Sequence, residues 1–100
     1  MTVDAHHHLW DPARRNYEWM TGEAAVLARR FDVSGLHAEL ATTPVEMTVL
    51  VQAVADAAET RELLATARRH SGTIAGVVGW ADLTAPGVRV KVEPSKDTYV

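Results

Sequence analysis

The chain has 100 residues and a formal net charge of −3, and 47% of its residues are hydrophobic. This composition excludes a disordered tail, and the mildly acidic charge argues against nucleic-acid binding, which requires a basic surface. The chain has no cysteine, which excludes disulfides and thiolate chemistry. No apolar run approaches the roughly 20 residues of a membrane helix and no secretory signal is visible, so a cytoplasmic protein is expected.

The first part of the chain predicts a short strand, a long loop and two short helices. Residues 1–5 are expected to form the strand, and Asp11-Pro12 then stops regular structure because proline cannot donate to a sheet. Thr21 can cap a short helix over residues 22–30. A second helical turn is expected over residues 34–41.

The middle of the chain predicts a strand, a helix and another strand. Residues 47–51 are apolar and β-branched, as in a strand buried on both faces of a parallel sheet. Residues 56–69 form the best helix, since Asp56 and Glu59 have the spacing of a capping box and Gly72 suits a left-handed helix end. Residues 74–80 form the third strand. This order predicts an α/β fold of the βαβαβ type with parallel strands.

The most informative motif is the segment from Val3 to Trp10, which contains three consecutive histidines. If the strand continues, His6 and His8 share one face and can bind one divalent metal, for which zinc is suited to neutral imidazole. His7 then faces the other way. Asp4 fixes a ring tautomer or satisfies backbone donors. The alternative is a solvated histidine run, and two ligands alone do not complete a zinc site.

Further candidate side chains lie where strands are expected to end. Gln52 follows the second strand and Trp80 ends the third. In a parallel barrel, side chains at these positions line the active site. The alternative is that Gln52 caps local backbone groups and that Trp80 packs in the core or at the rim. Trp10, Tyr17 and Trp19 either form a pocket wall or anchor the long first loop, and the anchoring role is favoured.

Other polar residues are expected at the surface. His37 and His70 are interpreted as surface or helix-capping histidines. The arginine pairs at residues 14–15, 29–30 and 68–69 alternate with acidic residues and are interpreted as solvated.

Several segments of the sequence together resemble a known family. Residues 3–12 are similar to the opening of the amidohydrolase-related lactonase branch, which includes L-fuconolactonase-like and 2-pyrone-4,6-dicarboxylate hydrolase-like enzymes. Residues 17–20, 48–53, 59–64 and 74–83 continue the likeness, which covers about residues 2–87. The resemblance implies the N-terminal βαβαβ portion of a (β/α)8 TIM barrel, a fold that needs about 250 residues and has its active site at the C-terminal strand ends.

The resemblance also implies a chemistry. In this family the positions that match His6 and His8 can hold a divalent metal, often zinc, which polarises a lactone carbonyl and activates water. A later-strand aspartate serves as general base or acid. Some relatives work without a metal. The implied function is a hydrolase that opens a sugar lactone or similar cyclic ester, with His6 and His8 catalytic and metal-binding, and with Gln52, Trp80 and Trp10 binding the substrate.

The resemblance stops near Pro86-Gly87, where residues 88–93 begin to alternate apolar and charged side chains. We therefore expect residues 1–87 to be the barrel portion and residues 88–100 to be a divergent tail. Our hypothesis is that the tail arose because the reading frame was truncated or shifted at this point. The isolated chain is then not expected to be active, and its exposed strand edges favour self-association. The alternatives are an inactive truncated product, a decarboxylase of the same superfamily, or a small α/β binding module.

Overall fold

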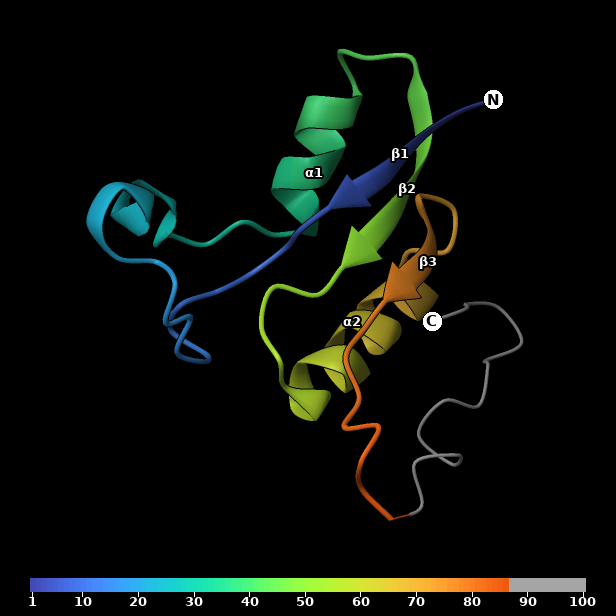
Figure 1. Cartoon of the computed structure of the whole chain (residues 1–100). Helices are drawn as coiled ribbons and strands as arrows, with labels where there is room; N and C mark the ends of the chain where they lie inside the picture. Colours follow the sequence, from blue (N-terminus) through green and yellow to red (C-terminus); the bar gives the residue numbers. More distant parts are fainter. Residues whose placement is uncertain (87–100) are drawn as a thin grey trace.

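The computed structural model describes residues 1–86 (Figure 1). The elements follow one another in the predicted order: β1 (Thr2–His7), the 3-10 helix η1 (Gly22–Leu27), α1 (Val33–Leu40), β2 (Val45–Val51), α2 (Ala57–Arg69) and β3 (Ile74–Val78). The three strands form one sheet in the order β1-β2-β3, and both pairings are parallel. The predicted α/β class with a parallel βαβαβ order is confirmed. The division expected at residue 87 and the tail over residues 88–100 lie outside the described residues.

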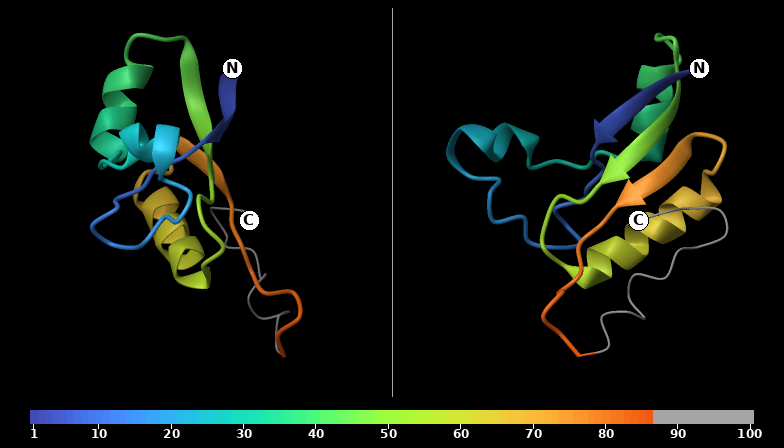
Figure 2. Two further views of the ribbon diagram at one scale, coloured as in Figure 1. Left: turned by 60° about the vertical axis from the view of Figure 1, so that its left-hand side comes forward. Right: turned by 45° about the vertical axis from the view of Figure 1, so that its right-hand side comes forward.

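Both α-helices lie on the same side of the sheet, as the left view of Figure 2 shows. The core forms between α2, β2 and β3, because the apolar side chains of these three elements meet there and leave water. The fully or almost fully buried residues of this core are Leu50, Leu63, Ala67, Ile74 and Val77, with Leu9, Leu36 and Leu64 packed against them. β1 and β3 are the edge strands of this sheet, and their Val3 and Val78 are 45% and 50% exposed.

The predicted start and end of α2 are confirmed, but the left-handed conformation expected of Gly72 is wrong. The Asp56 side chain accepts a hydrogen bond of 2.8 Å from the Ala58 N–H, as a helix N-cap should. Gly72 does not have a left-handed backbone; within residues 1–86 the glycine with positive φ is Gly22, at 58°. The last residue of the helix is Arg69, and its C-cap is His70, whose N–H is shared between the carbonyls of Thr66 and Ala67. Such shared bonds satisfy the last carbonyls without a glycine.

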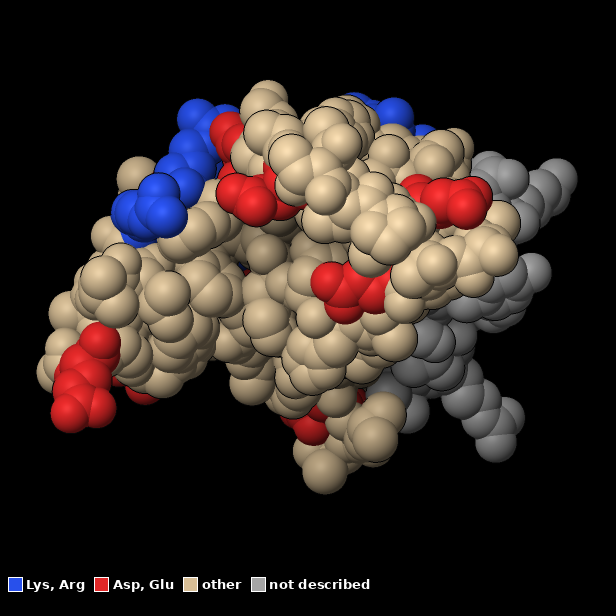
Figure 3. All heavy atoms as spheres, turned by 90° about the horizontal axis from the view of Figure 1, so that it is seen from above, with Lys and Arg blue, Asp and Glu red and all other residues tan. Residues whose placement is uncertain are grey.

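The two shorter helices differ in how they begin. Asp32 caps α1 through a hydrogen bond of 3.0 Å from the Gly35 N–H to its carboxylate. Thr21 precedes η1 but makes no side-chain capping bond, and the helix ends at Leu27, short of the predicted residue 30. None of the helices within residues 1–86 has the length and apolar character needed to cross a membrane. On the face seen in Figure 3, acidic and basic side chains form small separate groups and not one basic surface.

Candidate functional site

The histidine pair lies at the C-terminal end of β1. His6 is the penultimate residue of β1, and His8 directly follows the strand. Their ring centroids are 5.0 Å apart in an edge-to-face arrangement. The sheet register advances by three residues in β1, from Asp4 to His7, while β2 advances by two, which is the signature of a β-bulge. The Asp4 carboxylate accepts a hydrogen bond of 3.0 Å from the His6 N–H. Asp4 therefore satisfies a backbone donor, one of its two expected roles.

The tautomer of His8 is defined by its hydrogen bond to β2. Its Nδ1 lies 3.0 Å from the Val51 carbonyl oxygen at the end of that strand. Because a carbonyl oxygen only accepts, Nδ1 must carry the hydrogen, and in the neutral ring the lone pair is then on Nε2. Metal-binding histidines are held in the same way by a carbonyl or carboxylate partner. His8 is thus ready to bind a cation or accept a proton through Nε2.

His7 has a different environment from its two neighbours. It pairs with Leu50 in the sheet, and its Nε2 is buried without a hydrogen-bond partner. Burial lowers the pKa of His7, since the charged ring loses its hydration. His7 is half-buried, whereas His6 is exposed, so the two adjacent rings have different environments.

Within residues 1–86, His6 and His8 are two candidate metal ligands at this position, and they do not make a complete set. Within residues 1–86, no group of three or more His, Asp or Glu side chains could hold a metal ion. A catalytic zinc site uses three protein ligands and a water molecule. The chemistry of the two imidazoles and the tautomer of His8 fit a divalent cation, and any remaining ligand must come from elsewhere.

The three strands are parallel, and their C-terminal ends point the same way (Figure 1). Gln52 directly follows β2 and Trp80 lies two residues after β3, so both are at the end of the sheet that carries the histidine pair. The Gln52 N–H donates to the Val78 carbonyl over 2.7 Å, which joins the ends of β2 and β3. The Oε1 atom of Gln52 is buried and has no hydrogen-bond partner among residues 1–86. An unpaired buried oxygen is costly, and a donor on a bound molecule would remove that cost. Both side chains therefore remain candidates for substrate contact.

Trp10 is the centre of an aromatic cluster in the loop after β1. Its indole N–H donates to the Leu27 carbonyl over 3.0 Å, and its backbone pairs with Phe31. Ring centroids within 5.3–6.3 Å of the Trp10 ring belong to His8, Tyr17, Trp19 and Phe31. Tyr17 is 6% exposed, as an anchor of the loop should be. Trp19 is 41% exposed, and its indole donates to the Ala53 carbonyl, next to Gln52, over 2.9 Å.

Arg15 is a structural residue that sequence reasoning missed. Its side chain is only 13% exposed, and its guanidinium lies 2.7 Å from a Glu62 carboxylate oxygen and 3.5 Å from one of Asp56. Arg14 approaches the same Glu62 at 3.2 Å. The interpretation of this arginine pair as solvated is therefore wrong for Arg15. These partners lie more than 40 residues from Arg15 in the sequence, so no local spacing indicates them.

Comparisons with known proteins place this geometry in context. No protein-family model matches the chain. The chain is 40% identical over 81 residues to an L-fucono-1,5-lactonase of Burkholderia ambifaria, and 34% identical over 98 residues to an L-fucono-1,5-lactonase of Burkholderia multivorans. These matches cover 81% and 98% of this chain, but only 28% and 33% of the two lactonases.

Two crystal structures of an amidohydrolase from Burkholderia multivorans also match. The one with bound HEPES has a TM-score of 0.84 at 35% identity, and the one with bound zinc has a TM-score of 0.82 at 33% identity. The chain is related to the amidohydrolase-superfamily lactonases. The matches cover 92% and 98% of this chain and about a third of the amidohydrolase, 32% and 35%. The family resemblance and the partial-barrel fold class predicted from the sequence are confirmed.

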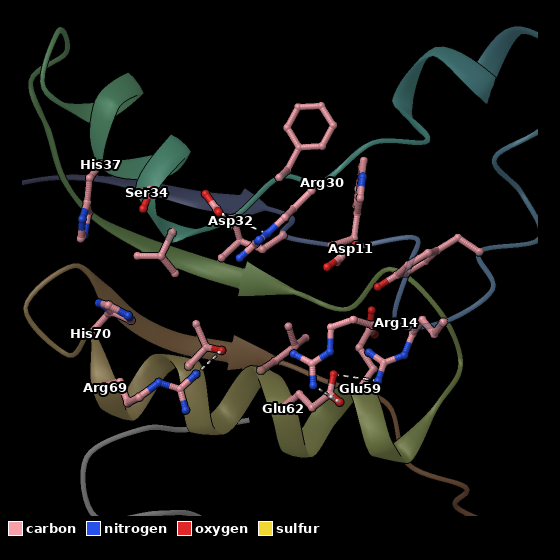
Figure 4. Close-up of a pocket in the computed structure, with 18 residues that line it drawn as sticks. Asp11, Arg14, Arg30, Asp32, Ser34, His37, Glu59, Glu62, Arg69 and His70 are labelled. Atoms are coloured by element: carbon pink, nitrogen blue, oxygen red, sulfur yellow. Dashed lines mark hydrogen bonds and ion pairs between the residues drawn. The ribbon is translucent and has the colours of Figure 1, made fainter.

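A separate pocket of about 370 Å³ lies on the helical side of this lactonase-like sheet (Figure 4). Trp10 lines it, whereas His6, His8, Gln52 and Trp80 do not. In Figure 4, Arg14 lies near Glu59 and Glu62 at one end, and His37 and His70 lie at the other end.

The two histidines of this pocket contact each other and not the pair at the end of β1. The ring centroids of His37 and His70 are 5.8 Å apart, and the His37 Nε2 atom lies 3.2 Å from the Thr73 hydroxyl. His37 is exposed and His70 caps the end of α2, as expected for both.

Proposed function

We propose that this chain forms part of the active site of a hydrolase that opens a sugar lactone or a similar cyclic ester by attack of water on the carbonyl. The observation that carries the proposal is the pairing of His6 with His8, whose Nε2 is left free by the bond from Nδ1 to Val51. The two relatives named L-fucono-1,5-lactonase support the substrate class. Because the chain spans about a third of their length, the complete activity requires residues that the described segment does not contain.

His6 and His8 would hold a divalent metal ion, zinc being favoured because a related amidohydrolase was crystallised with it. When bound, such an ion polarises the lactone carbonyl and lowers the pKa of a water molecule. The bond from His8 to Val51 keeps the ring oriented and, in the neutral ring, leaves the lone pair on Nε2 for the metal. A general acid or base, expected to be an aspartate, would come from outside residues 1–86.

Gln52, Trp80 and Trp10 would bind the substrate. The buried Oε1 atom of Gln52 can accept a hydrogen bond from a sugar hydroxyl group, which would give it the partner it lacks. Trp80 lies at the same strand end and offers an apolar surface for the ring. Trp10 contacts the His8 ring at a centroid distance of 5.9 Å and would limit the movement of that ring.

The proposal can be tested with a chimera in which residues 1–86 replace the matched segment of the Burkholderia multivorans lactonase. We expect the chimera to hydrolyse L-fucono-1,5-lactone. His6→Asn and His8→Asn should each reduce kcat/KM by at least about 100-fold, the upper range for loss of an outer-shell partner of a metal ligand. Metal content measured on the same samples should fall as well.

His37→Asn is the matched control, because this histidine lies in the separate pocket. It should leave both the activity and the metal content unchanged. A folded chimera that keeps its activity after both His6→Asn and His8→Asn, or a folded chimera without any lactonase activity, would contradict the proposed function.

A further inference from the structure

Thr60, in the first turn of α2, holds the backbone of Trp80 with one hydroxyl group. Its Oγ1 accepts a hydrogen bond from the Trp80 N–H and donates one to the Trp80 carbonyl, both at 2.8 Å. A hydroxyl can do both at once because it has one hydrogen and two lone pairs. A Cβ added at Gly79 would lie 2.5 Å from the Thr60 Cγ2 atom, so the glycine permits this close approach. The end of β3 is therefore fixed directly against the helix.

Glu59, the neighbour of Thr60, holds the backbone of the loop after β2. It is 1% exposed, and its carboxylate accepts hydrogen bonds from the Ala53 N–H at 3.1 Å and the Val54 N–H at 3.4 Å. The sequence spacing from Asp56 predicts a capping-box glutamate, which would accept from the Asp56 N–H. The carboxylate instead reaches the backbone that directly follows Gln52. One helical turn thus holds the segments that carry both Gln52 and Trp80.

We infer that Glu59 and Thr60 are positioning residues, which fix Gln52 and Trp80 relative to each other for substrate binding. The inference rests on the proposed function for the role of those two side chains. The Gln52 N–H bond to the Val78 carbonyl already joins the two strand ends, and the α2 turn fixes the residues just beyond that bond. Sites held by such supporting contacts lose activity when groups shift by about 1 Å.

The placement also predicts which kinetic constant depends on Thr60. Gln52 and Trp80 are proposed to bind the substrate, whereas the water attack depends on His6 and His8 at the end of β1. Loss of an interaction that is equal in the ground state and the transition state raises KM and leaves kcat unchanged. A loosened Trp80 should therefore weaken substrate binding more than it slows the chemical step.

The test compares three variants in the chimera described above: Thr60→Val, Thr60→Ser and Thr66→Val. Valine has the shape of threonine without its hydroxyl, and serine keeps the hydroxyl. Thr66 lies on the same helix, and within the described part of the chain its hydroxyl has one hydrogen bond, accepted from the exposed Arg69 at 3.3 Å, which makes it the matched control. Lactone hydrolysis gives KM and kcat. Hydrogen exchange of the Trp80 amide, measured on the same proteins and on the full 100-residue chain, reports the bond itself.

We expect Thr60→Val to raise KM about tenfold, and to speed Trp80 amide exchange about tenfold, the factor for one lost hydrogen bond. The kcat value should stay within about twofold, and Thr60→Ser and Thr66→Val should behave like the parent protein. The inference is overturned if Thr60→Val leaves KM and Trp80 exchange unchanged, or if Thr60→Ser is as impaired as Thr60→Val.

Two further outcomes are also decisive. If Thr60→Val does not fold, Thr60→Ala removes the hydroxyl without placing a methyl group against the Trp80 backbone, and the same expectations apply to it. If the chimera with unaltered residues 1–86 folds but has no lactonase activity, the proposed function fails. In that case Trp80 amide exchange alone decides whether Thr60 positions Trp80, and unchanged exchange overturns the inference.

Discussion

Glu59 shows how one side chain combines a structural benefit with an energetic cost. Its carboxylate satisfies the N–H groups of Ala53 and Val54, which would otherwise be left without a partner in a partly buried loop. Burial opposes ionisation and raises the pKa of Glu59, although both backbone hydrogen bonds and the charge of Arg15 act in the opposite direction. The same residue therefore defines the loop after β2 and makes the stability of the chain depend on pH.

We predict that Glu59→Gln removes one component of this pH dependence. A carboxyl group whose pKa is higher in the folded than in the unfolded state binds more protons when folded, so it stabilises the fold at low pH. That stability is lost as the pH rises from the ordinary pKa, about 4.3, through the raised one. Urea unfolding at several pH values from about 4 to about 7 should show the difference in unfolding free energy, parent minus variant, decreasing with pH. A difference that is constant or rises with pH would show that burial does not dominate the pKa of Glu59.

At the scale of the elements, the position of the segment between β1 and α1 depends on contacts with residues distant in the sequence. Arg14 and Arg15 pair with Glu62 on α2, and the Trp19 indole bonds to the Ala53 carbonyl after β2. The loop is therefore attached to the same helix that holds the ends of β2 and β3. In a barrel of the lactonase type, this arrangement would give three neighbouring loops at the active-site edge one common support.

We expect Glu62→Ala to release this loop, because it removes the partner that Arg14 and Arg15 share and leaves Arg15 with the longer contact of 3.5 Å to Asp56. Trypsin cleaves after arginine, so cleavage at Arg14 and Arg15 under native conditions measures the release. The rate should rise about fivefold or more, which corresponds to roughly 1 kcal/mol for a partly exposed ion pair. Glu39→Ala is the control, since the exposed Glu39 side chain lies on α1 and makes no ion pair among the described residues. Equal cleavage in the parent and in Glu62→Ala would mean that the ion pairs do not hold the loop.

The elements themselves could be predicted from the sequence, whereas the contacts between them could not. The apolar run of β2 and the cap at Asp56 are local signals, and the structure has both. The Thr60 bonds to Trp80 and the Arg15 bonds to Glu62 join residues 20 and 47 positions apart, and neither partner has a pattern that indicates the other. Glu59 is an intermediate case, because its spacing correctly indicated a helix start but its hydrogen-bond partners depend on the path of the preceding loop.

For the candidate site, the sequence predicted the side chains but not their environments. Alternation along a strand was enough to place His6 and His8 together, and they are in ring contact. The β-bulge in β1 and the bond from His8 to Val51 arise only when β2 is paired beside β1. The unpaired Oε1 of Gln52 likewise follows from burial, which a strand-end position does not reveal.

At the scale of the whole molecule, the sheet formed by residues 1–86 has β1 and β3 at its edges, and the helices cover one of its faces (Figure 2). The matched region is about a third of the chain of the related amidohydrolase. An edge strand presents unpaired N–H and C=O groups, to which another chain can add in the same way as a neighbouring strand. Val78 on β3 adds an apolar side chain that is 50% exposed at such an edge.

We therefore predict that the 100-residue polypeptide self-associates through these edges. Sedimentation velocity over a range of concentrations should give a sedimentation coefficient that rises with concentration. Val78→Lys should suppress the rise, because a charged side chain on an edge strand opposes pairing with another sheet. Val26→Lys is the matched control: Val26 is 77% exposed but lies on η1, away from the sheet. If Val26→Lys suppresses association as strongly as Val78→Lys, the contact is general hydrophobic adhesion and not strand pairing. A parent chain that stays monomeric at every concentration would exclude both.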